Sequence, residues 1–281
     1  MSRRGSVCIK AANIEDANLE YIVEGSGEEP VVFIHGSIIV DANAPLLKQQ
    51  ILADNYRLIS YHRRGFAGSE SYKTDLPPTI SRQASECQAL MDYLQVRSAH
   101  LVGHSQGGVI ALQFALDYSA SVRTLSLLEP ALVGFIPEAK VIQQKFVPII
   151  QAYEIGDKTG AIDQMLEMIG GREYRNVTES VLPGSFDQAV ADADSLFKID
   201  MPAMRSWSIR REELRRIEAP VLSVMGSESE PMFRETCEVV RQWFPKSEML
   251  LVQNATHWLQ LTNPTGLAEG LVNFFSKHSK T

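Results

Sequence analysis

Six short apolar segments recur along the chain, and each is bounded by turn residues. They occupy residues 30–36, 56–61, 99–104, 123–129, 220–226 and 248–253. Continuous runs of Val, Ile and Leu of this length are typical of strands that are buried on both faces, as in a parallel sheet covered by helices. The pattern of apolar and polar positions therefore predicts six strands of a mostly parallel sheet.

Segments with a helical period lie between these runs. In residues 81–94 and again in residues 267–275, apolar side chains recur three or four positions apart, which is the spacing of one helix face. Strands that alternate with such helices indicate the α/β class, with a central parallel sheet. Residues 6–10 and 19–25 flank a polar turn and predict an antiparallel hairpin added at the sheet edge.

One long interval, residues 131–217, contains no good strand segment. Its readable parts are helical, at residues 161–170 and 184–197, and prolines punctuate the rest. This interval predicts a helical cap, or lid, inserted into a core that consists of residues 1–130 and 218–281.

Composition and charge exclude several classes of partner. The formal net charge is 27 minus 34, or −7, so the surface offers no excess of cations for a nucleic-acid backbone. No apolar run reaches the roughly 18 residues needed to span a bilayer. Cys8, Cys87 and Cys237 lie far apart and are odd in number, which favours neither a disulfide framework nor a zinc site. These features predict a cytoplasmic protein that binds neither nucleic acid nor a membrane.

Gly103, His104, Ser105, Gln106 and Gly107 match the pattern Gly-x-Ser-x-Gly between an apolar run and a helical one. A tight turn from strand to helix pushes the serine side chain outward and needs small residues beside it. The unpaired N–H groups of the following helix stabilise negative charge on a substrate oxygen, and the N–H of Gln106 is one such donor.

A serine nucleophile needs a base, which is usually a histidine held by a carboxylate. Of the six histidines, His257 follows the last predicted strand and precedes the last helix. It should therefore lie at the same sheet edge as Ser105, where ligands bind in open α/β sheets. His35 and His62 also end apolar runs and are placed to shape this edge.

The chain resembles the α/β-hydrolase superfamily. The resemblance is carried in order by "VVFIHGS", "YHRRGFAGS", "LVGHSQGG", "LLEPA", "PVLSVMG" and "NATHWLQLTNP", which span nearly the whole chain. It implies Ser105 as the nucleophile, His257 as the general base and the N–H of Ser37 as a second oxyanion donor. Arg63 and Arg64, in the second of these stretches, are expected to be structural.

The acid that orients the base has three candidates. The aspartate that the superfamily commonly carries after "PVLSVMG" is replaced by Ser229, which leaves Glu228 and Glu230 beside it. Glu129 ends the strand after the nucleophile helix, a position that some relatives such as haloalkane dehalogenases use. Because a charge at the end of such an apolar strand is costly unless it is paired, Glu129 is favoured over Glu230 and Glu228.

These residues predict hydrolysis of a small-molecule carboxylic ester or related acyl substrate through an acyl-enzyme, a reaction that requires no cofactor or metal. Two alternatives remain open, namely carbon–carbon hydrolysis or cofactor-free lyase or oxygenase chemistry, and a small-ligand receptor with a vestigial triad. A lipophilic substrate is indicated by apolar side chains of the cap, which are Phe135, Phe146, Met165, Met168, Phe186, Phe197, Met201, Met204 and Trp207.

Overall fold

The computed structural model of the chain describes residues 8–14, 16–73 and 79–279. Its centre is an eight-stranded sheet in the order β1-β2-β4-β3-β5-β6-β7-β8. β1 pairs antiparallel with β2 and β2 antiparallel with β4, while all the other neighbours are parallel. The strands are β1 (Lys10–Ile14), β2 (Ala17–Glu24), β3 (Glu29–Ile34), β4 (Tyr56–Tyr61), β5 (Ala99–His104), β6 (Val122–Leu128), β7 (Val221–Gly226) and β8 (Glu248–Val252).

The α/β prediction and the six parallel strands are confirmed, as is the hairpin at the edge, but the hairpin is displaced. Its first strand begins at Lys10, whereas residues 6–10 were expected to form it; residues 6 and 7 lie outside the described part. Ala12 and Ile14 face the core while Asn13 faces solvent. The polar Asn13, which suggested a turn, is therefore an outward position of a half-buried strand.

Helices cover both faces of the sheet and bury an apolar core against each. One face is covered by α3 (Ile80–Tyr93), α4 (Gln106–Asp117) and α10 (Pro231–Trp243). The other is covered by α1 (Ala44–Leu47), α2 (Gln50–Ala53), α11 (Leu259–Thr262) and α12 (Pro264–Ser276). Strands β3 and β5 are buried along nearly their whole length, which explains their continuous apolar runs.

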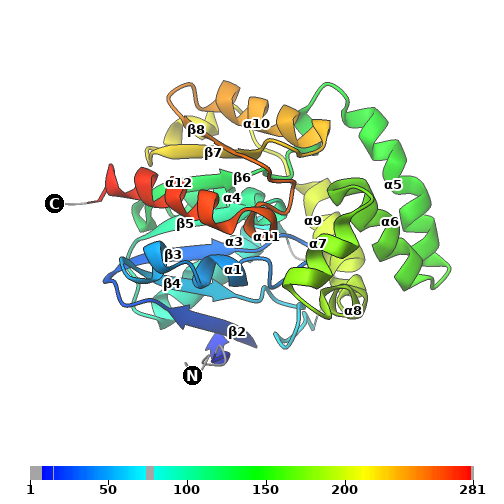
Figure 1. Cartoon of the computed structure of the whole chain (residues 1–281), viewed down its shortest axis with the longest axis horizontal. Coiled ribbons are helices and arrows are strands. Elements are labelled where there is room, and N and C mark those ends of the chain that lie inside the picture. The colour runs from blue at the N-terminus through cyan, green and yellow to red at the C-terminus, as the bar shows by residue number, and fades with distance from the viewer. Residues whose placement is uncertain (1–7, 15, 74–78, 280–281) are drawn as a thin grey trace.

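The chain between β6 and β7 forms a helical insertion that lies beyond one end of the strands (Figure 1). Its apolar core is shared with Ile38, Ile39, Ala42, Trp258 and Leu261, which lie outside the insertion. Among the described residues, no helix is both long and apolar enough to cross a membrane. The insertion contains the short 3₁₀ segment Val133–Phe135, α5 (Ala139–Glu154), α6 (Lys158–Gly170), α7 (Tyr174–Val181), α8 (Ser185–Ala191), the π-helical segment Ser195–Asp200, α9 (Met201–Ser206) and the 3₁₀ segment Glu213–Arg216.

The prediction of one helix over residues 184–197 is wrong, because the structure divides this stretch into α8 and the π-helical segment. Asp192 lies at the break, where both of its carboxylate oxygens accept hydrogen bonds from the backbone N–H of Ala67 at 3.2 Å. This contact joins the insertion to a core loop distant in sequence, so helical periodicity alone does not reveal it.

Candidate active site

Ser105 occupies a strained turn between β5 and α4. Its φ of 53° and ψ of −120° lie in a region that a residue with a Cβ rarely adopts, at a cost of about 1–3 kcal/mol. The turn is held from both sides, because the Ser105 N–H donates to the Leu128 carbonyl at 2.9 Å and the Ser105 carbonyl accepts from the Ala131 N–H at 2.9 Å. Tertiary contacts with the end of β6 thus maintain the strain.

Glycines allow the turn to pack this closely. A Cβ on Gly103 would lie 2.3 Å from the Gly107 carbonyl oxygen, and one on Gly107 would lie 2.1 Å from the Ile34 carbonyl oxygen. Gly36 is close as well, since a Cβ there would lie 3.2 Å from the Ser105 Cβ. The Gly-x-Ser-x-Gly spacing therefore reflects close approach of α4, β5 and the chain that follows β3.

His257 and Glu129 form a buried pair at the carboxyl ends of the parallel strands, where Ser105 also lies. His257 Nδ1 lies 2.7 Å from Glu129 Oε2, and both side chains are at most 1% exposed. The second oxygen, Oε1, accepts from the Gly226 backbone N–H at 2.7 Å. Because the carboxylate accepts at Nδ1, it places the imidazole proton on that atom and leaves Nε2 as a base. His257 Nε2 has no hydrogen-bond partner among the described residues.

The His257 ring is held in place by its neighbours. It stacks on Phe233 with ring centroids 3.5 Å apart, and its backbone carbonyl lies 2.8 Å from His104 Nε2. Burial, together with the nearby His257, holds the pKa of His104 well below the usual range. His104 therefore stays neutral and donates Nε2–H to the His257 carbonyl. Neither this role nor that of Phe233 was predicted, because both depend on contacts between distant segments.

The other acid candidates lie elsewhere. Glu228 and Glu230 are exposed, and no hydrogen bond or ion pair joins either to His257 among the described residues. Ser229, where the superfamily commonly has an aspartate, is buried, and a Cβ on Gly226 would lie 2.6 Å from its Oγ. The structure thus pairs His257 with Glu129, at the end of the strand that precedes the insertion.

A cavity of about 620 Å³ brings the predicted site residues together. Ser105, His257, Ser37 and Gln106 all line it, and the Ser37 hydroxyl donates to Gln106 Oε1 at 3.0 Å. Six of the nine apolar cap residues also line it, namely Phe135, Phe146, Met165, Met201, Met204 and Trp207. The other three, Met168, Phe186 and Phe197, pack in the core of the insertion.

The two arginines predicted to be structural are buried in ion pairs. Arg63 binds Asp200 and Arg64 binds Asp16, with nitrogen–oxygen distances of 2.6 and 2.8 Å. Neither arginine lines the cavity. In the described part of the chain, no group of three or more His, Cys, Asp and Glu side chains could hold a metal ion.

Comparison with known proteins agrees with this architecture. Residues 31–269 match the model of the alpha/beta hydrolase family. The chain belongs to this family. As an alpha/beta hydrolase it shares its fold with a thermophilic esterase from Thermogutta terrifontis, with a TM-score of 0.81 at 18% identity, over 97% of this chain and 100% of that one.

Curated relatives of this alpha/beta hydrolase are distant. It is similar to the sn-1-specific diacylglycerol lipase of Mus musculus, with 23% identity over 94% of this chain and 87% of that protein. It is 32% identical over 124 residues to the dihydrolipoyllysine-residue acetyltransferase component of the acetoin cleaving system from Cupriavidus necator. That match covers 44% of this chain and only 32% of the relative's length.

Proposed function

We propose that this alpha/beta hydrolase is a serine hydrolase that cleaves carboxylic esters through an acyl-enzyme. One observation carries the proposal. Ser105, on its strained turn, shares a cavity with His257, whose Nδ1 is bound by the buried Glu129 and whose Nε2 is free. This is the set of groups that activates a serine hydroxyl, in which the acid fixes the tautomer of the base.

In the proposed mechanism, His257 Nε2 takes the Ser105 hydroxyl proton while Oγ attacks the substrate carbonyl carbon. The N–H groups of Ser37 and Gln106 stabilise the oxyanion, and His257 then gives the proton to the leaving alcohol oxygen. Water attacks the acyl-enzyme with the same base, which releases the acid and restores Ser105. Glu129 stabilises the protonated His257 through its hydrogen bond with Nδ1.

The cavity supports a lipophilic acyl or aromatic substrate. Its walls are mainly aliphatic, aromatic and methionine side chains. Arg205, at the exposed rim, is the one Asp, Glu, Lys or Arg side chain among the described residues that line it. The interior therefore offers no charged partner, so a charged group on the substrate would have to stay at the rim. The names of two curated relatives, a diacylglycerol lipase and a monoacylglycerol lipase, support the same substrate class.

The test is hydrolysis of p-nitrophenyl acetate, butyrate and octanoate by the purified protein. Each buried methylene contributes about 0.8 kcal/mol, so kcat/KM should rise by up to about fourfold per methylene until the acyl chain reaches the rim. Ser105→Ala and His257→Gln should abolish turnover, whereas Ser119→Ala, at an exposed serine beyond α4, should not change it. If Ser105→Ala keeps the parent rate, the serine hydrolase proposal is wrong.

Some distant relatives carry other names, including the 2-hydroxy-6-oxo-6-phenylhexa-2,4-dienoate hydrolase of Comamonas testosteroni. A parent protein that turns over no ester but cleaves a carbon–carbon bond in a vinylogous diketone would replace the esterase proposal. A protein that binds small ligands in the cavity without turnover would favour the receptor alternative.

A further inference from the structure

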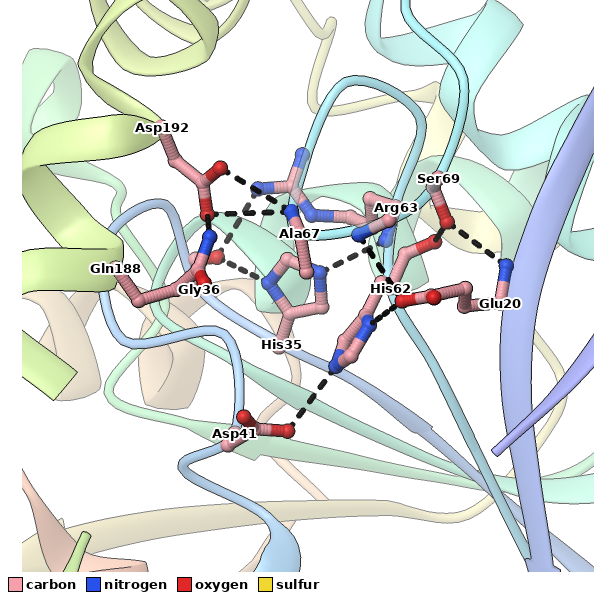
Figure 2. A network of polar contacts seen from close by, with 11 residues as sticks. Glu20, His35, Gly36, Asp41, His62, Arg63, Ala67, Ser69, Gln188 and Asp192 are labelled. Carbon is pink, nitrogen blue, oxygen red and sulfur yellow. Dashed lines mark hydrogen bonds and ion pairs between the residues drawn. The ribbon is translucent and has the colours of Figure 1, made fainter. Parts of the chain in front are cut away.

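The peptide that carries the second proposed oxyanion donor is held by two hydrogen bonds on its far side. The Gly36 carbonyl oxygen lies 2.5 Å from His35 Nδ1 and 3.0 Å from Arg63 Nη2 (Figure 2). The backbone N–H of Arg63 donates to His35 Nε2 at 2.8 Å. Because Nε2 accepts, the His35 proton resides on Nδ1 and is donated to the Gly36 carbonyl.

His35 keeps this single tautomer. Burial, followed by the positive charge of Arg63, lowers the pKa of His35 well below its usual range, so the ring stays neutral. The Gly36 carbonyl and the Ser37 N–H belong to one planar trans peptide and point in opposite directions. Fixing the carbonyl from one side therefore fixes the direction of the Ser37 N–H on the other.

Arg63 is itself held by the insertion. Its Nη2 and Nη1 lie 2.6 and 2.9 Å from the two carboxylate oxygens of Asp200, and Nη1 also donates to Gln83 Oε1 at 2.6 Å. The Arg63 and Asp200 side chains are 3% and 0% exposed. Asp200 ends the π-helical segment and directly precedes Met201, which lines the cavity. The guanidinium thus joins the cavity wall to the Gly36–Ser37 peptide.

A second contact ties the same core loop to the insertion. Asp192, at the break before the π-helical segment, binds the Ala67 N–H four residues after Arg63 (Figure 2). The Ser195 hydroxyl of the π-helical segment also donates to the Gly65 carbonyl in this loop. The loop after β4 is therefore joined to the insertion at three points, of which only Arg63 reaches the peptide beside Ser105.

We propose that Asp200, acting through Arg63, is a positioning residue that orients the Ser37 N–H toward the substrate oxyanion. This inference rests on the proposed serine hydrolase mechanism. Because the carboxylate that fixes Arg63 comes from the insertion, the oxyanion hole is complete only when the insertion packs against the core so that Asp200 contacts Arg63. A preorganised donor aimed at developing charge stabilises the transition state more than the bound substrate.

The test removes the ion pair without leaving a lone buried charge. Replacing both partners with apolar residues of similar volume is often neutral for stability, whereas removing one partner is strongly destabilising. The double variant Arg63→Met/Asp200→Leu therefore loses the donor to Gly36 but keeps a filled, uncharged core. The control is Arg64→Met/Glu86→Leu, which removes the neighbouring buried Arg64–Glu86 pair and the Arg64 bonds to the exposed Asp16, none of which contacts Gly36.

Two measurements, the change in kcat relative to KM and the affinity for two ketones, distinguish a positioning role of the ion pair from a purely structural one. Loss of one oxyanion donor costs about 10²–10³ in kcat, so misorientation of Ser37 should lower kcat by about ten- to hundredfold with little change in KM. Affinity for an alkyl trifluoromethyl ketone, whose Ser105 adduct carries an oxyanion, should fall in parallel. Affinity for the matching methyl ketone, which stays unreacted, should not change.

The inference is overturned if the folded double variant keeps the kcat and trifluoromethyl ketone affinity of the parent, or if the control variant loses as much of both. Should the double variant fail to fold, Arg63→Lys provides the same comparison, because one ammonium group lacks the fork that reaches both Asp200 and Gly36. Parent activity that is independent of Ser105 would refute the hydrolase mechanism itself, and this inference with it. Parent turnover that depends on Ser105, with unchanged Arg63 variants, would refute only the positioning role.

Discussion

Replacing Glu129 with glutamine preserves the shape of the side chain but breaks its hydrogen-bond pattern. In the parent, the two carboxylate oxygens accept from His257 Nδ1 and from the Gly226 N–H, each at 2.7 Å. Glutamine offers one oxygen and one NH₂ group, so it satisfies only one of these donors. Glu129 and His257 are both buried, so no water can replace the hydrogen bond that is lost.

Either orientation of the amide impairs the base. With its oxygen toward Gly226, the NH₂ group faces His257 Nδ1, which must then accept, and the imidazole proton moves to Nε2. In that tautomer Nε2 takes no proton from Ser105. With the oxygen toward His257, two N–H groups face each other at Gly226, an unsatisfied contact that costs about 1–3 kcal/mol, and the negative charge that stabilises the imidazolium is absent.

The expected loss is large and lies in kcat. The corresponding acid-to-amide change in a serine protease lowers kcat by about 10⁴, which is about 5.4 kcal/mol of transition-state stabilisation. We therefore expect Glu129→Gln to lower kcat for p-nitrophenyl butyrate by about 10³–10⁴ with KM nearly unchanged. Thermal unfolding, followed by circular dichroism, establishes that the variant is folded.

The controls are the two alternative acids. Glu228→Gln and Glu230→Gln alter exposed carboxylates that do not bind His257, so each should keep kcat within about twofold of the parent. A folded Glu129→Gln protein that retains more than a tenth of the parent kcat would refute the reasoning. A steep loss in Glu230→Gln or Glu228→Gln would assign the acid to that residue instead.

Three further predictions concern stability, measured by urea unfolding. Glycine ordinarily costs about 0.4–1 kcal/mol of stability relative to alanine. At position 105 the φ of 53° is strained for alanine but not for glycine, so Ser105→Gly should be at least as stable as Ser105→Ala. A less stable glycine variant would argue against the strain. Gly107→Ala should lose about 1–3 kcal/mol as its Cβ meets the Ile34 carbonyl oxygen, and parent-like stability would contradict that close approach. Burial alone would lower the pKa of His62, but hydrogen bonds led by the one to Asp41 raise it above the unfolded value. The contribution of His62 to the free energy of unfolding is therefore complete at low pH and is lost as the pH rises through the folded pKa. His62→Gln should accordingly destabilise the protein more at about pH 6 than at about pH 9, and an equal loss at both would count against a charged His62.

The local pattern of the chain determined the strands, the large helices and the turn at Ser105. Strand and helix periods are set by backbone geometry within a few residues, so they can be recognised without knowledge of the fold. The same locality explains the errors. Asn13 has the polarity of a turn residue and lies in a strand, and the helix expected at residues 184–197 breaks at Asp192, where a contact with Ala67 intervenes.

The sequence favoured Glu129 among the three glutamates, but only the tertiary structure shows which of them binds His257. Glu129 and His257 are 128 positions apart and meet because β6 and β8 end at one edge of the sheet, whereas Glu228 and Glu230 face solvent. The Arg63–Asp200 pair likewise joins residues 137 positions apart. Residue type indicated that a buried carboxylate needs a partner, but the packing of distant segments decided which partner it has. The strength of a buried charge pair depends on the distance between its charges, and sequence spacing does not encode that distance.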